Sequence, residues 1–299
     1  MRFSIFHTSR IGARLTNQDR LGYWRTSAAL LMVVADGMGG HLHGELAAEL
    51  VVEYCASAFR RSARPRLADP GAFLLHTLAG GHAAIVRRAA ELGLAETPRT
   101  TAVACVVQDG TAHWSHVGDS RLYLVREGRL LARTRDHTLV QRLIDAGRIR
   151  EEAVPSHPDR NKLLQCLGGD PPPKLEPAKS ASLAKNDIVL LCSDGLWGPL
   201  TPTQLLTGLL ARDLERAVHG LVELAEARSG PECDNVSVLA LSWGENEVPA
   251  ARADTYQEPP TVAQDFTATE PDFLRTSDAE IDRAIAEIKA ALRKHSRIP

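Results

Sequence analysis

Three apolar runs that resemble β-strands each lie next to an aspartate that is followed by Gly or Asn. The runs are LLMVVADG (30–37), DIVLLCSDG (187–195) and DNVSVLALSW (234–243). If these strands share a sheet, Asp36, Asp194 and Asp234 meet at one edge, with no Lys beside them in the sequence. Unpaired carboxylates at such distances repel one another, and a hard divalent cation with oxygen ligands is the natural way to keep them ionised. The pattern predicts a metal-dependent hydrolase.

Composition limits the remaining classes of protein. The 299 residues, 44% hydrophobic and 24% charged, suffice for one large domain or a domain with an appendage. A formal net charge of -2 gives no electrostatic case for nucleic acid or an anionic membrane as the main partner. No run approaches the ~20 apolar residues of a membrane span, so we expect a cytoplasmic protein. The five cysteines never form a C-x-x-C pair, which predicts reduced thiols rather than disulfides or structural zinc.

Local patterns predict a mixture of strands and helices. The expected strands are 3–7, 22–26, 30–35, 101–107, 112–117, 121–125, 187–192 and 236–243. Short turns at Asp109-Gly110 and Gly118-Asp119 make the central strands antiparallel neighbours. The expected helices are 44–61, 70–92, 137–146, one that opens at the capping box Thr201-Pro202-Thr203-Gln204, and 213–227. A turn-rich, basic stretch at 147–177 is compatible with a surface flap.

The C-terminal part of the chain has a different composition. Pro, Ala, Thr and Asp dominate 245–272, which predicts a linker. We therefore expect a domain at 1–246, a linker at 247–275 and an amphipathic helix at 276–299. Ser277 and Glu280 form a capping box, and one helical face carries Ile281, Ile285, Ile288 and Leu292. A lone short helix needs a surface to bury against, on this domain or on another protein.

Seven motifs together resemble the PPM (PP2C-type) family of metal-dependent Ser/Thr protein phosphatases, in its bacterial branch. They are RLTNQD (14–19), VVADGMGGHLHGE (33–45), RTTAV (99–103), SHVGDSRLYLV (115–125), RDHTLVQRLIDAGRI (135–149), LLCSDGLWG (190–198) and CDNVSVL (233–239). The similarity spans about residues 3–243 and leaves the tail uncovered. It implies an α+β fold of two packed antiparallel sheets flanked by helices, a PP2C-like αββα sandwich.

The resemblance also implies a set of metal ligands. Asp36 would bridge two Mn²⁺ or Mg²⁺ ions, and Gly37 would offer its backbone carbonyl to the second ion. Asp194 and Asp234 would complete the first ion, and Asp119 with Asp194 would hold a weaker third ion. Two metals roughly 3.5 to 4 Å apart can activate a shared water and offset charge on the phosphoryl oxygens, which suits these roles.

Two further residues receive catalytic roles from the resemblance, and two positions depart from the family pattern. Arg14 would grip the substrate phosphate through its planar fork, and Asp19 would orient metal-bound water. Gln18 stands where the family usually has Glu, which predicts weaker affinity for the second metal. Met38 replaces the His that is a proposed acid for the leaving group in eukaryotic relatives, so protonation would fall to a metal-bound water; His41 is a weaker candidate.

Other polar residues have ordinary structural explanations. An isolated Asp-Gly is most often a turn, which we expect for Asp109-Gly110. Asp136-His137 fits an N-cap for the next helix. The basic segment 142–162 fits equally a solvated face and the flap that contacts substrate in the family. The histidines expected to be structural or surface groups are His113, His116 and His157.

The sequence thus predicts a phosphatase that removes phosphate from phosphoserine and phosphothreonine in proteins, in opposition to a Ser/Thr protein kinase and without a covalent phosphoenzyme. No Cys nucleophile in a C-x₅-R loop is present. One alternative is a catalytically weak relative that binds phosphoproteins or acts as a scaffold through its C-terminal helix; the metal aspartates together with Arg14 argue against it. A third possibility is a regulator of anti-sigma-factor antagonists, the role of related stress-response phosphatases.

Overall fold

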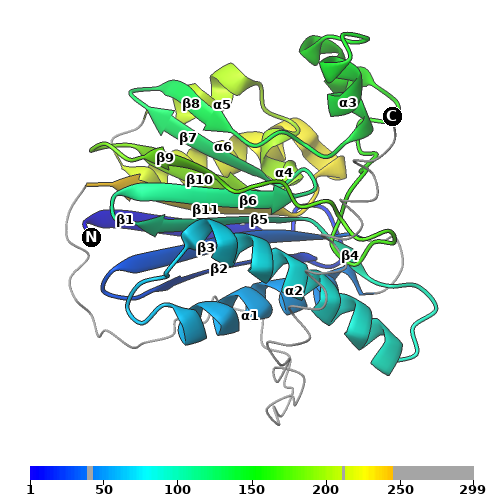
Figure 1. Cartoon of the computed structure of the whole chain (residues 1–299). Coiled ribbons are helices and arrows are strands. Elements are labelled where there is room, and N and C mark those ends of the chain that lie inside the picture. Colours follow the sequence, from blue (N-terminus) through cyan, green and yellow to red (C-terminus); the bar gives the residue numbers. More distant parts are fainter. Residues whose placement is uncertain (39–42, 211–212, 245–299) are drawn as a thin grey trace.

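The protein is a sandwich of two antiparallel sheets with helices on both outer faces (Figure 1). The computed structural model describes residues 1–38, 43–210 and 213–244. The expected α+β sandwich is confirmed within these ranges. The linker at 247–275, the helix at 276–299 and His41 lie outside the described residues.

The first sheet has five strands in the order β1-β11-β10-β7-β8. Their bounds are β1 Phe3–Arg10, β11 Val236–Trp243, β10 Ile188–Cys192, β7 Arg121–Arg126 and β8 Arg129–Arg133. The first strand of the sandwich, β1, pairs with the last, β11, with Phe3 opposite Trp243 and Arg10 opposite Val236. This pairing closes the domain near the point where the expected last strand ends.

The second sheet follows the order β2-β3-β5-β6-β9, with β4 paired to the end of β3. Its strands are β2 Asp19–Arg25, β3 Ala29–Met38, β4 Arg99–Thr100, β5 Ala102–Gln108, β6 Thr111–Val117 and β9 Lys179–Ser182. Asp109 and Gly110 both have positive φ, 55° and 69°, as a two-residue hairpin turn requires. The expected turn between β5 and β6 is confirmed.

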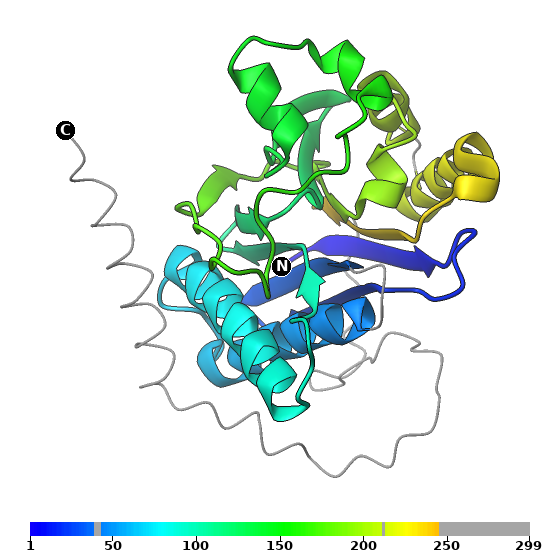
Figure 2. The ribbon, with the colours of Figure 1, turned by 90° about the vertical axis from the view of Figure 1, so that its right-hand side faces the viewer.

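Two helical layers cover the sheets (Figure 2). The elements are α1 Gly44–Ser62, α2 Pro70–Glu91, α3 Leu139–Asp145, η1 Glu151–Ser156, α4 Asp194–Trp197, α5 Pro202–Gly208, α6 Leu214–Ser229 and η2 Gly230–Glu232. Two expected N-caps are confirmed: Asp69 accepts the Ala72 N–H at 3.0 Å, and Thr201 with Gln204 forms a full capping box. Among the described elements, no helix has both the length and the apolar character to cross a membrane.

Strand β3 shows how the core is layered, because both of its faces are buried. Alternate side chains point to opposite faces of a sheet. Leu30, Met32 and Val34 join the layer between the two sheets, and the residues between them pack against α1 and α2. A third apolar layer lies between the first sheet and helices α4, α5 and α6. The unbroken apolar run at 30–35 therefore reflects a strand covered on both sides.

The structure corrects three expectations. The N-cap of α3 is Thr138, whose Oγ1 accepts the Gln141 N–H at 3.2 Å, and not Asp136-His137. The strand that carries Asp36 continues to Met38, so this aspartate lies within the strand. Two short edge strands, β8 and β9, were not expected from the sequence.

Candidate active site

The site begins with a pair of aspartates that face each other across two neighbouring strands. Asp19 opens β2 and pairs in register with Asp36 of β3. The backbone of Asp36 is held by the RTTAV motif: Thr101 N–H donates to its carbonyl at 2.8 Å, and Thr100 Oγ1 donates to the same oxygen at 2.8 Å. Register thus brings two distant motifs to one point, the end of the second sheet.

Asp19 also contacts the first sheet. Ser193, at the end of β10, donates its Oγ hydrogen bond to Asp19 Oδ2 at 2.8 Å, and Ser237 N–H of β11 donates to that serine oxygen at 3.0 Å. Burial, together with the smaller effect of the charges of Asp194 and Asp234, raises the pKa of Asp19 to about 7, although hydrogen bonds from Ser193 and Ser237 act in the opposite direction. This carboxylate therefore lies between the two sheets.

The other acidic residues come from loops and from the first turn of a short helix. Asp119 lies in the turn between β6 and β7, Asp194 is the first residue of α4, and Asp234 comes just before β11. Burial and the neighbouring carboxylates raise the pKa of Asp36 and Asp119 well above the usual range, and burial with the charge of Asp234 raises that of Asp194 to about 6. Burial is the largest cause of these raised pKa values and the neighbouring like charges add to it, whereas a bound cation would lower them.

Arg14 lies in the loop between β1 and β2, at the rim of the acidic cluster. Its Nη2 donates to Asp234 Oδ2 at 2.7 Å, in an ion pair whose side chains are 58% and 40% exposed. Asn235 holds this loop in place: its Nδ2 donates to the carbonyls of Ile11 and Thr16 at 2.8 and 3.0 Å, and its Oδ1 accepts the Gln18 N–H at 2.8 Å. The loop position of Arg14 thus depends on a buried amide.

Gly37 lies where the backbone of β3 passes close to the start of α1. A Cβ at this position would lie 2.2 Å from the Gly44 carbonyl oxygen and 2.7 Å from that of Gln18, so only glycine fits. Gln18 Nε2 donates to Glu45 Oε2 at 3.2 Å, which fixes the amide that stands in place of the family's Glu. Met38 ends β3 opposite Arg99.

These residues provide the donor set that a hard divalent cation requires, since all of the acidic donors are carboxylate oxygens. Besides burial, the charges of four other carboxylates raise the pKa of Asp36, namely those of Asp19, Asp194, Asp119 and Asp234. Over the described ranges, no three Asp, Glu, His or Cys side chains form a ready-made ligand group. Mg²⁺ usually keeps several waters and takes only one or two carboxylates from the protein, so the cluster fits ions of this kind.

A cavity of about 410 Å³ opens beside the acidic cluster. Its inner wall includes Asp194 and Asp234, and it extends between α5 and the segment that carries α3 and η1. Val140 and Val154 are among the residues that line it. Part of the basic segment 142–162 therefore lines this cavity, although its basic side chains Arg142, Arg148, Arg150, Arg160 and Lys162 are exposed.

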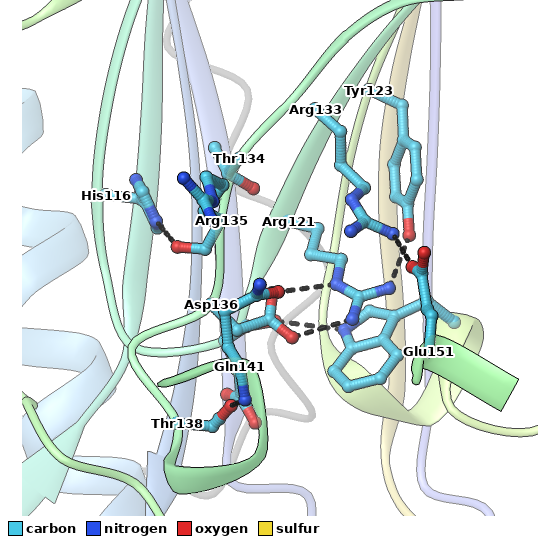
Figure 3. Close-up of polar contacts among 12 residues, drawn as sticks. His116, Arg121, Tyr123, Arg133, Thr134, Arg135, Asp136, Thr138, Gln141 and Glu151 are labelled. Atoms are coloured by element: carbon cyan, nitrogen blue, oxygen red, sulfur yellow. Dashed lines mark hydrogen bonds and ion pairs between the residues drawn. The ribbon is translucent and has the colours of Figure 1, made fainter. Parts of the chain in front are cut away.

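Two neighbouring histidines support the turn that carries Asp119. The rings of His116 and His137 stack with centroids 4.5 Å apart. Burial and the neighbouring His116 lower the pKa of His137 to about 4, so its neutral Nδ1 accepts the Gly118 N–H at 3.2 Å. His116 Nε2 contacts the Arg135 carbonyl at 2.7 Å (Figure 3). Both rings therefore have structural roles, as expected for His116.

The structure brings Arg14, Asp19, Asp36, Gly37, Asp119, Asp194 and Asp234 to one end of the sandwich. Sequence reasoning missed Ser193 and Asn235, which hold Asp19 and the Arg14 loop. The signal for Asn235 was its position directly after a candidate ligand, since a buried Asn in a loop usually bonds backbone groups.

Similarity to known proteins agrees with this geometry. The family described as Protein phosphatase 2C matches residues 7–217. The chain therefore belongs to the protein phosphatase 2C family.

Several bacterial proteins of this family are close in sequence. The serine/threonine protein phosphatase PstP of Mycobacterium tuberculosis is 36% identical over 233 residues, which cover 76% of this chain and 42% of PstP. The serine/threonine phosphatase stp of Listeria monocytogenes is 31% identical over 240 residues, which cover 79% of this chain and 94% of that protein. The chain thus spans less than half the length of PstP.

Solved structures share the fold. The crystal structure of Mycobacterium tuberculosis PstP/Ppp has a TM-score of 0.72 and 33% identity, covering 81% of this chain and 99% of that chain. The catalytic domain of PstP in complex with two manganese ions has a TM-score of 0.70 and 30% identity, covering 81% and 98%.

Proposed function

We propose that this protein is a metal-dependent phosphatase that hydrolyses phosphoserine and phosphothreonine in proteins. The observation that carries the proposal is the convergence of five carboxylates at one end of a protein phosphatase 2C fold, with an arginine at their rim. The carboxylates are Asp19, Asp36, Asp119, Asp194 and Asp234. Manganese in a solved relative supports Mn²⁺ or Mg²⁺ as the cofactor.

Each residue of the site has a proposed task. Asp36, Asp194, Asp234 and the Gly37 carbonyl hold two ions, and Asp119 with Asp194 holds a weaker third. When bound, two such ions supply a nucleophile from water near neutral pH and offset charge on the phosphoryl oxygens. Asp19 lies where its oxygens, fixed by Ser193, can orient the attacking water.

Arg14 is available to bind the substrate phosphate. Its ion pair with Asp234 is exposed, and such pairs contribute only about 0 to 1 kcal/mol. A phosphate that offers two parallel, charge-assisted hydrogen bonds can therefore take Arg14 from Asp234 at little cost. Binding of a cation by Asp234 would favour the same exchange.

The proposed substrates, opposing enzyme and cellular compartment rest on the relatives and on the chemistry of the chain. Relatives named as serine/threonine phosphatases support phosphorylated proteins as substrates. A Ser/Thr protein kinase is the proposed opposing enzyme, because such a kinase would form the phosphoserine and phosphothreonine that this protein would hydrolyse. The five cysteines are free, which fits the reducing cytoplasm. We assign the activity to residues 1–246, with 247–275 as a linker and 276–299 as a helix that binds a protein surface.

The test is turnover of a phosphothreonine peptide by the purified protein with Mn²⁺, with Mg²⁺ and with EDTA. We expect phosphate release with either metal and none with EDTA. Asp36→Asn should remove nearly all activity while the protein remains folded, because the amide keeps the shape but lacks the charge. A folded Asp36→Asn protein with wild-type turnover would refute the metal assignment. Tight peptide binding without turnover by the wild type would favour the scaffold alternative.

A further inference from the structure

One candidate metal ligand, Asp194, shares a single helical turn with a tryptophan that hydrogen-bonds to the backbone of another, Asp119. Asp194 is the first residue of α4 and Trp197 is the last, three positions later on the same side of the turn. The Gly198 N–H closes this turn on the Asp194 carbonyl at 2.7 Å. The indole Nε1–H of Trp197 donates to the backbone carbonyl of Asp119 at 3.0 Å. Asp119 and Asp194 are thus joined through one rigid side chain.

The indole is itself held by a buried ion pair. The Arg121 guanidinium carbon lies 3.4 Å from the centroid of the Trp197 ring. Arg121 donates two parallel hydrogen bonds to Asp136, Nε to Oδ1 at 2.8 Å and Nη2 to Oδ2 at 2.6 Å, and a third from Nη1 to the Tyr123 hydroxyl at 3.0 Å (Figure 3). A bidentate pair fixes the plane of the guanidinium, and the stacked plane fixes the ring.

The same cluster adjoins the segment that borders the cavity. Asp136 lies two residues before Thr138, the N-cap of α3, and Arg133 of β8 donates to Glu151 of η1 at 2.9 Å (Figure 3). Arg121 and Trp197 also line the cavity. The support of the indole therefore comes from β7 and from the connection between β8 and α3.

We propose that Trp197 is a positioning residue that fixes Asp119 relative to Asp194, and that the Arg121–Asp136 pair holds the indole for this purpose. The inference rests on the proposed function, in which these two aspartates share the weakest cation. Loss of the indole N–H leaves the Asp119 carbonyl without this donor and lets the turn that carries Asp119 shift. The affinity for the most weakly bound ion should therefore fall, while the affinity for the two ions at Asp36 should not change.

The chain offers a matched control. Trp114 of β6 is 4% exposed, and its Nε1 has no hydrogen-bond partner among the described residues. Trp197→Phe and Trp114→Phe therefore make the same chemical change, but only the first removes a hydrogen bond. Arg121→Lys is a second test variant, because it keeps the charge and loses one of the two parallel bonds to Asp136.

The experiment counts bound Mn²⁺ by electron paramagnetic resonance of the free ion, on the full chain without substrate. Trp197→Phe should weaken the weakest site roughly fivefold to tenfold and Arg121→Lys about two- to threefold, with the two tighter sites unchanged. Trp114→Phe should leave all sites unchanged. In peptide turnover, the Mn²⁺ concentration for half-maximal rate should rise by the same factor while KM at saturating Mn²⁺ stays constant.

Three results would overturn the inference: wild-type affinity for the weakest ion in folded Trp197→Phe, equal weakening in Trp114→Phe, or a wild type that binds no third Mn²⁺ at millimolar concentration. Absence of wild-type turnover would instead count against the proposed function. The metal titration needs no turnover, so the two failures are distinguishable.

Discussion

Removal of a metal-site carboxylate should stabilise the metal-free protein, and Asp194→Asn measures this effect. Burial and the Asp234 charge raise the pKa of Asp194 from 3.8 to about 6. At pH 8 the folded protein thus bears an ionisation cost of about 2 pKa units, or about 3 kcal/mol at 1.36 kcal/mol per unit. Because Asp194 is only half-buried, this is an upper limit. Asparagine keeps an acceptor oxygen and carries no charge.

The direction of the pKa shift determines how the contribution of Asp194 to folding stability changes with pH. A carboxyl whose pKa is higher in the folded state binds more protons there, so its stabilising contribution is complete below pH 3.8 and lost as the pH rises through about 6. In EDTA, the free energy of unfolding of Asp194→Asn should therefore exceed that of the wild type by about 1 to 3 kcal/mol at pH 8. At pH 4.5 the difference should be about a third as large.

Urea unfolding followed by tryptophan fluorescence at both pH values provides the assay. Asp213→Asn is the control, because Asp213 is an exposed N-cap of α6 and Asn caps a helix equally well. With Mn²⁺ at about 100 times its Kd, the wild type should gain about 2.7 kcal/mol and Asp194→Asn much less. Equal or lower stability of Asp194→Asn at pH 8 in EDTA, with no difference between the pH values, would refute the electrostatic reasoning.

Three further predictions concern the phosphate, the loop and the tail. Arg14→Ala should mainly raise KM for a phosphopeptide, whereas Asp119→Ala should lower kcat and alter metal dependence; the same parameter affected in both would contradict this division. Asn235→Ala should raise KM for the phosphopeptide several-fold, because it removes hydrogen bonds that hold the loop carrying Arg14. An unchanged KM in a folded variant would show that the loop keeps its position without Asn235. Truncation after Gly244 should leave hydrolysis of p-nitrophenyl phosphate largely unchanged; a large loss in a folded protein, judged by size-exclusion chromatography, would place the tail in the active site.

The central strands were predictable because their apolar runs are long. The 30–35 run is buried on both faces, and the 187–192 and 236–243 runs pair with each other in the middle of the first sheet. The edge strands were not predictable. Strand β8 reads RLLAR with two half-exposed leucines, and β9 reads KSAS, so neither shows the alternation of a half-buried strand.

The cluster of acidic residues was predictable in part for a similar reason. Asp36, Asp194 and Asp234 each adjoin a strong strand signal, and family resemblance added Asp19 and Asp119. The Arg121–Asp136 pair was not predictable, because its partners lie 15 residues apart and meet only through the bend after β8. Local pattern therefore favoured an N-cap at Asp136, whereas tertiary pairing left that role to Thr138.

Some of the aspartates lie in the strands of one sheet and others in segments next to the strands of the other, which has a consequence for mutations far from them. Asp19 and Asp36 move with the second sheet, and Asp194 and Asp234 with the first. The apolar layer between the sheets, which includes Met32, sets the offset between these two halves. A change of side-chain volume in that layer can slide one sheet across the other, and catalytic geometry tolerates shifts of well under 1 Å. Substitutions there should reduce turnover by more than their cost in folding free energy explains.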